Sequence, residues 1–203
     1  MFRDPSPPTP LRCAEGGARL IALALLLSGC GGGPQPPARW AVGGARLDLP
    51  AARWTYDGDD VEIRPFSPDY AQILVDGDVE LHVDRAGRVY DRYRRMLAVL
   101  EPDGRLVGLD NELLGMVGGV NAAQPGKAHA WLSITPQGGV VKYQGSGAAV
   151  GAGQWLGCSA SPFATQTCLL VSYLLYFEDE GERTGERAPV GIGVGIGIGV
   201  TGP

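Results

Sequence analysis

Lysine is almost missing from this sequence of 203 residues, in which Lys127 and Lys142 are the only two. The formal net charge at pH 7 is -5, and no run of basic residues is longer than Arg94-Arg95. Proteins that bind nucleic acid depend on clustered Lys and Arg side chains that neutralise phosphates. The composition therefore argues against nucleic acid as a partner.

Histidine is equally scarce, since only His82 and His129 occur and they lie far apart in the sequence. This excludes a metal site built from several histidines. The sequence also lacks the Gly-x-Ser-x-Gly elbow that presents a nucleophilic serine. It lacks the phosphate-binding loop that ends in Lys-Ser or Lys-Thr as well. The acidic stretches 57–60 and 76–78 lack the ligand spacing of a calcium loop and are typical of turns instead. We therefore predict no catalytic residues, no metal and no cofactor.

The apolar run Leu20–Leu27 is far shorter than the roughly 20 residues that a membrane-spanning helix needs. It does fit the apolar core of a secretory signal, which is about 7–15 residues long. Basic residues precede it, and small residues follow it up to Cys30. The first part of the chain is therefore predicted to be an export signal.

The tetrapeptide Leu27-Ser28-Gly29-Cys30 resembles the lipobox of bacterial lipoproteins. The resemblance implies that the Cys30 thiol carries a diacylglycerol, that cleavage falls before Cys30, and that the new amino group receives an acyl chain such as palmitate. Two or more chains hold a protein stably on a membrane, because each buried methylene contributes about 0.8 kcal/mol. Gly31, where an Asp would retain the protein at the inner membrane, favours the outer membrane of a bacterial envelope. An ordinary secretory signal with a chance cysteine is the alternative.

Four cysteines are present, and two of them have a predicted fate. Cys13 would be removed with the leader, and Cys30 would carry the lipid. Cys158 and Cys168 remain, and paired cysteines in an exported protein indicate a disulfide. We therefore predict one bond between them.

Glycine, with 32 residues, and proline, with 16, make an all-helical domain implausible. Asp76-Gly77 lies between the apolar runs 72–75 and 79–83, which predicts a hairpin. In the second run Val79, Leu81 and Val83 alternate with polar residues and would share one face of a strand.

Two similar stretches begin at Gly87 and Gly104, and each is long enough for one two-stranded unit. Residues 84–117 weakly resemble bacterial β-flower-type repeats, in which such strands recur around a centre. Chance similarity between neighbouring hairpins is the alternative. Together these patterns predict a mainly β fold in which antiparallel hairpins from short repeats form a barrel- or sandwich-like sheet.

The C-terminal part of the chain contains two unusual apolar segments. The nearly continuous run 168–177 is typical of a central strand that is buried on both faces, with a helix as the alternative. In the segment 190–200 every second residue is Gly, which suggests an edge or closing strand of the sheet, or else a low-complexity tail. The predicted organisation is a signal peptide (1–29), a Gly/Pro-rich tether (30–39), a β-rich domain (40–177), a charged linker (178–189) and a Gly-Ile/Val tail (190–203).

Trp54, Trp131 and Trp155 are candidates for aromatic side chains that face a ligand, although aromatic residues of β proteins are mostly core. The favoured function is a lipid-anchored envelope protein with a structural or interaction role. Its partners would be the membrane and either a cell-wall glycan or an envelope protein. A carbohydrate- or peptidoglycan-binding module is one alternative, and an envelope hydrolase with an acidic site is the other.

Replacing Cys30 tests the anchor directly. We expect Cys30→Ala to release the protein from membranes and to abolish incorporation of radiolabelled palmitate, because no thiol remains at the cleavage site. Labelling of the immunoprecipitated protein measures this. Label that persists in the variant would refute the lipid assignment.

Overall fold

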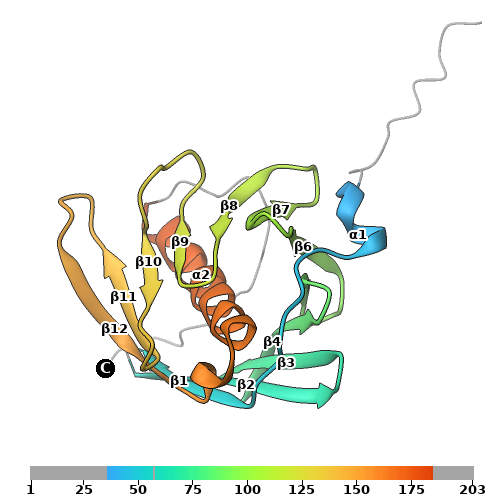
Figure 1. The fold of residues 1–203 in the computed structure, drawn as a ribbon, viewed down its shortest axis with the longest axis horizontal. Helices are drawn as coiled ribbons and strands as arrows, with labels where there is room; N and C mark the ends of the chain where they lie inside the picture. Colours follow the sequence, from blue (N-terminus) through green and yellow to red (C-terminus); the bar gives the residue numbers. More distant parts are fainter. Residues whose placement is uncertain (1–35, 57, 185–203) are drawn as a thin grey trace, which may run out of the picture. The chain divides into compact units, whose positions relative to one another are not determined.

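The computed structural model describes residues 36–56 and 58–184, and in it the chain folds into a closed antiparallel β-barrel (Figure 1). Neighbouring strands follow the order of the chain, and β1 pairs with β12 to complete the ring. The mainly β, hairpin-built fold predicted from the sequence is thus confirmed, and it is a barrel. The strands are β1 (Ala52–Tyr56), β2 (Asp59–Ser67), β3 (Tyr70–Val75), β4 (Asp78–Asp84), β5 (Arg88–Asp91), β6 (Met96–Leu100), β7 (Arg105–Gly108), β8 (Leu113–Val117), β9 (Asn121–Ala123), β10 (Leu132–Ile134), β11 (Gly139–Tyr143) and β12 (Ala149–Leu156). The helices are α1 (Ala38–Val42), the short 3-10 helix η1 (Cys158–Ala160) and α2 (Pro162–Thr184).

The hairpin predicted at Asp76-Gly77 is present between β3 and β4. Both turn residues have positive φ, 50° for Asp76 and 91° for Gly77, as the tightest hairpin turns require. Leu81 and Val83 point into the core as the alternation predicts. The two repeat-like stretches form the hairpins β5–β6 and β7–β8, while their resemblance to β-flower repeats stays a prediction.

The run 168–177 is helical, so the prediction of a central strand there is wrong. Val171 is the only β-branched residue in this run, and its four leucines favour a helix. The start of α2 is also well marked, because Ser161 is extended and its Oγ accepts a hydrogen bond from the Ala164 N–H at 3.0 Å. Pro162 then occupies the first helical position, which proline favours.

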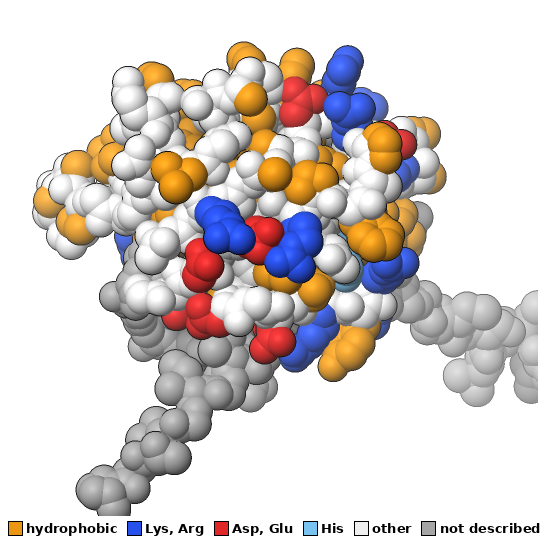
Figure 2. Space-filling model, turned by 90° about the horizontal axis from the view of Figure 1, so that it is seen from below, with side chains coloured by type: hydrophobic (Ala, Val, Ile, Leu, Met, Phe, Trp, Pro, Cys, Tyr) orange, Lys and Arg blue, Asp and Glu red, His pale blue; other side chains and the backbone are white. Residues whose placement is uncertain are grey.

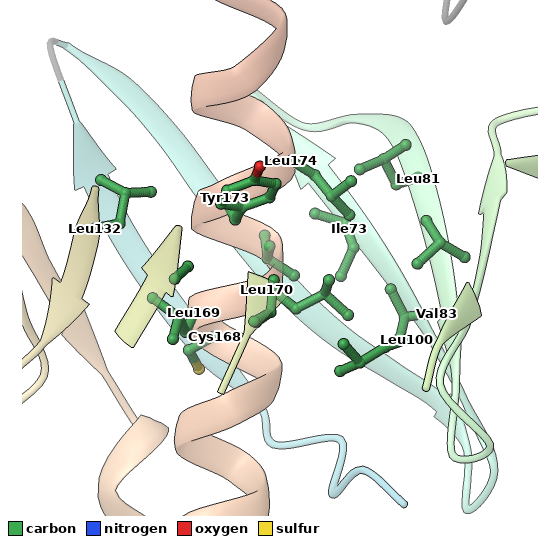
Figure 3. Close-up of a cluster of buried hydrophobic side chains, with 14 of the residues drawn as sticks. Ile73, Leu81, Val83, Leu100, Leu132, Cys168, Leu169, Leu170, Tyr173 and Leu174 are labelled. Carbon is green, nitrogen blue, oxygen red and sulfur yellow. The ribbon is translucent and has the colours of Figure 1, made fainter. Parts of the chain in front are cut away.

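Helix α2 lies inside the barrel rather than against its outer surface (Figure 1). Every residue from Thr167 to Leu174 is buried, so no face of this part of the helix meets solvent. Figure 3 shows the helix between Leu132 on one side and Ile73, Leu81 and Val83 on the other. A helix and a central strand that are buried all round have the same continuous apolar pattern, which explains the error.

Polar side chains of α2 also bond to the barrel wall. The Tyr173 hydroxyl donates to the Leu114 carbonyl of β8 at 2.7 Å, and the Trp155 indole N–H donates to Ser172 Oγ at 2.8 Å. A Cβ at Gly115 would collide with the Tyr173 hydroxyl, so glycine there permits the close approach. Burial raises the pKa of Tyr173, which keeps the hydroxyl protonated as a donor.

The disulfide between Cys158 and Cys168 is present, with Cα atoms 6.1 Å apart. Both cysteines are buried, and the bond joins η1, just after β12, to α2. The barrel wall and its internal helix are therefore linked covalently where the chain turns inward.

Helix α1, the first element of the described chain, is attached to the outside of the barrel. Arg88 Nε donates to the Trp40 carbonyl at 2.7 Å, and the Trp40 ring meets Tyr90 edge-on at a centroid distance of 5.1 Å. Asp84 holds Arg88 from the other side at 3.0 Å. The last residues of the predicted tether are thus part of the folded unit.

The predicted boundaries after the β-rich domain meet the structure only in part. Helix α2 continues to Thr184, into the segment 178–189 that we predicted as a linker. The Gly-Ile/Val tail 190–203 lies outside the described residues, and within them β1 and β12 close the sheet. Across residues 36–56 and 58–184, no helix is both long and apolar enough to cross a membrane.

Removing the disulfide should weaken the fold by a known order of magnitude. We expect Cys158→Ala combined with Cys168→Ala to lower the free energy of unfolding by about 2.5–3 kcal/mol, because the short loop that the bond closes becomes free in the unfolded chain. Urea unfolding measures this, and reductant should give the same loss in the native protein and none in the double variant. Two titratable thiols in mature protein before reduction would contradict the bond.

The hydrogen bond from Tyr173 offers a test of the internal helix. We expect Tyr173→Phe to lower the free energy of unfolding by about 1–3 kcal/mol, because the buried Leu114 carbonyl loses its donor. Tyr93→Phe is the matched control, since Tyr93 is exposed and should give no measurable change. Equal stability of the two variants in urea would show that α2 does not lie against β8 as described.

Candidate ligand-binding site

A cavity of about 700 Å³ opens at the end of the barrel where α2 finishes. Hairpin turns alternate between the two ends of an antiparallel barrel, and this end receives the β9–β10 loop and the β11–β12 turn. The lining residues come from these two connections and the strand ends beside them. They are Gln124, Lys127, His129, Trp131, Lys142, Tyr143, Gln144, Gly145 and Val150, and we call this space the end cavity.

The end cavity has a frame of backbone hydrogen bonds. The Trp131 N–H donates to the Ala122 carbonyl at 2.7 Å, and the Tyr143 N–H donates to the Trp131 carbonyl at 2.9 Å. The Gln144 N–H closes the β11–β12 turn on the Ala148 carbonyl, also at 2.9 Å. These bonds fix the backbone around the end cavity before any ligand arrives, which reduces the cost of binding.

The base of the end cavity is aromatic and touches the internal helix. Trp131 is only 6% exposed and meets Tyr173 edge-on at a centroid distance of 5.5 Å. The Lys142 ammonium lies 5.5 Å from the Trp131 ring centre and 5.2 Å from that of Tyr176. Such contacts between a cation and aromatic faces are attractive, and they fix the ammonium at the cavity.

A second hollow of about 430 Å³ adjoins the end cavity, because His129, Tyr143, Gln144 and Gly145 line both. It adds Ser146 and Gly147 at the tip of the β11–β12 turn. Together the two spaces present hydroxyl, amide and imidazole groups along one rim, where an elongated ligand could contact them.

Among the described residues, no Asp or Glu side chain lines the end cavity or its neighbour. This differs from the face of the barrel in Figure 2, where basic, acidic and apolar side chains are mixed. Elsewhere on the barrel, Glu62 accepts hydrogen bonds from Arg64 at 2.7 and 3.2 Å. Both lysines of this acidic chain border the end cavity.

The tryptophans predicted to face a ligand divide into two groups. Trp54 and Trp155 are each 1% exposed and stack on one another inside the barrel, with centroids 5.4 Å apart. The prediction is wrong for these two, because they face each other across the β1–β12 pair that closes the ring. Trp131 alone of the three borders the end cavity.

The best-connected carboxylates serve turns rather than a cleft. Asp84 accepts from the N–H groups of Ala86 and Arg88 and from the Tyr90 hydroxyl. Burial, together with the charge of Asp84, raises the pKa of Tyr90 to about 12. These contacts support the β4–β5 turn and do not bring two carboxylates face to face, as glycoside hydrolysis would require.

His82 is buried on the outward side of β4, away from the end cavity. It stacks on Tyr70 with centroids 5.3 Å apart, and its Nε2 lies 3.4 Å from the Arg92 carbonyl. Burial lowers its pKa, so the ring is neutral at physiological pH. Within the part of the chain that the structure describes, no group of three or more His, Cys, Asp or Glu residues is arranged to hold a metal ion.

The sequence matches no protein-family model, no curated protein and no solved structure. Geometry and chemistry of the described residues therefore carry the functional argument.

Sequence reasoning did not find Lys127, His129 and Lys142 as site residues. Lys127 and His129 lie in the β9–β10 loop and Lys142 lies in β11, and the pairing of β10 with β11 brings them to one space. The one signal available was the scarcity of lysine, because the two lysines of the chain both border the end cavity.

Proposed function

We propose that this protein is a lipid-anchored protein of the bacterial envelope, and that its barrel binds a small ligand in the end cavity rather than catalysing a reaction. The lipobox-like tetrapeptide ending at Cys30 supports the anchor, and Gly31 favours the outer membrane as its location. The end cavity supports the binding role, and it is the observation on which this proposal depends.

Three properties make the end cavity suited to binding. Its volume of about 700 Å³ lies within the range of small-molecule sites, about 300–1,000 Å³. Its backbone frame is formed by hydrogen bonds of 2.7–2.9 Å. Its lining combines the aromatic rings of Trp131 and Tyr143 with several polar side chains around one space, which suits a polar ligand.

Carbohydrate or peptidoglycan fragments are the second candidate, and a specific observation favours them. Trp131 and Tyr143 border the end cavity beside the side-chain amides of Gln124 and Gln144. Aromatic rings pack against the C–H faces of sugars, and amides bond to sugar hydroxyls in both directions. A hydrolase would need facing carboxylates, and the described lining offers none.

Blocking the end cavity tests the proposal. A Cβ added at Gly145 meets no atom within 4 Å, so Gly145→Trp should fold normally and fill the mouth of the end cavity with an indole. We expect a ligand supplied at about 100 times its Kd to raise the melting temperature of the native protein by about 5–10 °C. The same ligand should leave Gly145→Trp unchanged.

Gly119→Trp is the matched control. A Cβ at Gly119 also meets nothing within 4 Å, and this residue lies in the β8–β9 turn at the opposite end of the barrel. Both variants and the native protein would be screened by thermal shift against neutral sugars, sugar acids, amino acids, short peptides, nucleotides and fatty acids. The proposal fails if no compound distinguishes native protein and Gly119→Trp from Gly145→Trp.

A further inference from the structure

We propose that one outer wall of the barrel lies against the surface of the bilayer that holds the lipid anchor. This wall consists of the outside of β2 to β5 together with α1 and the β5–β6 turn (residues 92–95), and we call it the tether face. The inference rests on the proposed anchor at Cys30 and adds an orientation to it. It is carried by the place where the chain joins the barrel and by the side chains exposed there.

The chain joins the barrel at the tether face. The Arg88 guanidinium donates to the carbonyls of Trp40 and Ala41, at 2.7 and 3.2 Å. The Gly44 N–H then donates to the Ala86 carbonyl at 2.6 Å. Because these bonds fix the start of the folded unit beside the β4–β5 turn, an anchor only a few residues earlier in the chain brings this wall to the lipid before the opposite one.

The three most exposed large hydrophobic side chains among the described residues all belong to elements of the tether face. Val42 of α1 is 76% exposed, Tyr93 of the β5–β6 turn is 69% exposed, and Phe66 near the end of β2 is 68% exposed. Single exposed apolar side chains need no explanation, but several on one wall mark a surface that contacts a membrane or a partner.

A line of aromatic rings crosses the tether face. Trp40 of α1 meets Tyr90 of β5, and the Tyr90 ring lies 6.1 Å from that of Tyr70 on β3. The Arg94 guanidinium lies over the Tyr70 ring at 5.4 Å. Tryptophan and tyrosine prefer the interface between membrane and water, because their rings are apolar while their polar edges can stay hydrated. This composition favours a bilayer as the partner of the tether face.

The arginines of the β5–β6 turn surround an exposed ring. The guanidinium carbons of Arg92 and Arg95 lie 5.4 and 5.3 Å from the centre of the Tyr93 ring. Arg92 also pairs with Glu80 at 3.9 Å, and Arg95 pairs with Asp91 at 2.5 Å. A guanidinium has five N–H donors, so it can bond to a lipid phosphate while it pairs with a carboxylate. The turn therefore suits phospholipid headgroups without requiring a net positive charge.

The ring of strands places the opposite wall away from the lipid. Strands β4 and β10 are six places apart in the closed ring of twelve, and α1 and β10 lie on opposite sides of the barrel (Figure 1). With the tether face on the bilayer, the β9–β10 loop that lines part of the end cavity would face the aqueous side.

Site-specific labels measure which wall meets the bilayer. The mature lipoprotein would carry one new cysteine, either Ser67→Cys on the tether face or Ala128→Cys in the β9–β10 loop, both at exposed positions. Each protein would be labelled with a fluorophore and reconstituted in phosphatidylcholine vesicles, with and without lipid that carries a nitroxide on its headgroup. We expect the nitroxide to quench the label at residue 67 strongly and the label at residue 128 weakly, because quenching requires contact with the lipid surface.

A pair of substitutions connects the orientation to an exposed ring. In protein labelled at residue 67, Tyr93→Ser should shift the equilibrium about three- to tenfold toward the undocked state, as half-burial of one large apolar side chain implies, and quenching should fall. Leu156→Ser is the matched control and should leave quenching unchanged, since Leu156 is 67% exposed on β12, outside the tether face. Both variants should melt like the native protein, because neither side chain is buried.

The outcomes separate the orientation from the anchor. If the two labels are quenched equally, or the label at residue 128 more strongly, the orientation is wrong while the anchor stands. If Leu156→Ser lowers quenching as much as Tyr93→Ser does, the tether face is not the contact surface. If the reconstituted protein does not float with the vesicles, the anchor is wrong and the orientation fails with it. Ligand binding in the end cavity is tested independently by the Gly145→Trp variant.

Discussion

The burial of α2 within the ring of strands is the constraint on which the rest of the structure depends. A barrel of about eight strands is just wide enough for its own side chains to fill, and this one has twelve. Its interior needs a further element, and an uncharged stretch of helix that can be buried on every side supplies it. The inward residues of the wall, such as Ile73 and Leu132, then have an apolar partner.

The same helix determines the geometry of the end cavity. Tyr173 and Tyr176 of α2 contact Trp131, and Tyr176 lies beneath the Lys142 ammonium. The core and the site therefore share residues instead of being separate layers. A change in how α2 packs in the barrel would therefore move the base of the end cavity.

Local patterns were enough to predict parts of this architecture. The Asp76-Gly77 turn, the alternation in β4 and the disulfide follow from residues close together in the chain or from the predicted export. The strand assigned to 168–177 failed because a helix inside a barrel and a strand inside a sheet bury the same kind of side chain. The Ser161-Pro162 start of α2 was the local feature that distinguishes them.

The end cavity was beyond prediction for a different reason. Its residues lie on the β9–β10 loop, the β11–β12 turn and the strand ends beside them, and their meeting depends on the register of β9 to β12. Trp54 and Trp155 show the same limit, since an aromatic residue in a strand lies in the core or outside it according to which face of the strand turns into the barrel. Neither property is encoded in composition or spacing.

The attachment of Trp40 to the barrel wall by Arg88 sets a limit on distance. With α1 held on the outside of β4 and β5, only residues 30–37 remain between Cys30 and the folded unit, and a chain of that length reaches at most about 25 Å. If Cys30 carries acyl chains, the barrel stays within about that distance of the lipid surface. A lipid at Cys30 would thus keep the surfaces of the barrel close to the membrane.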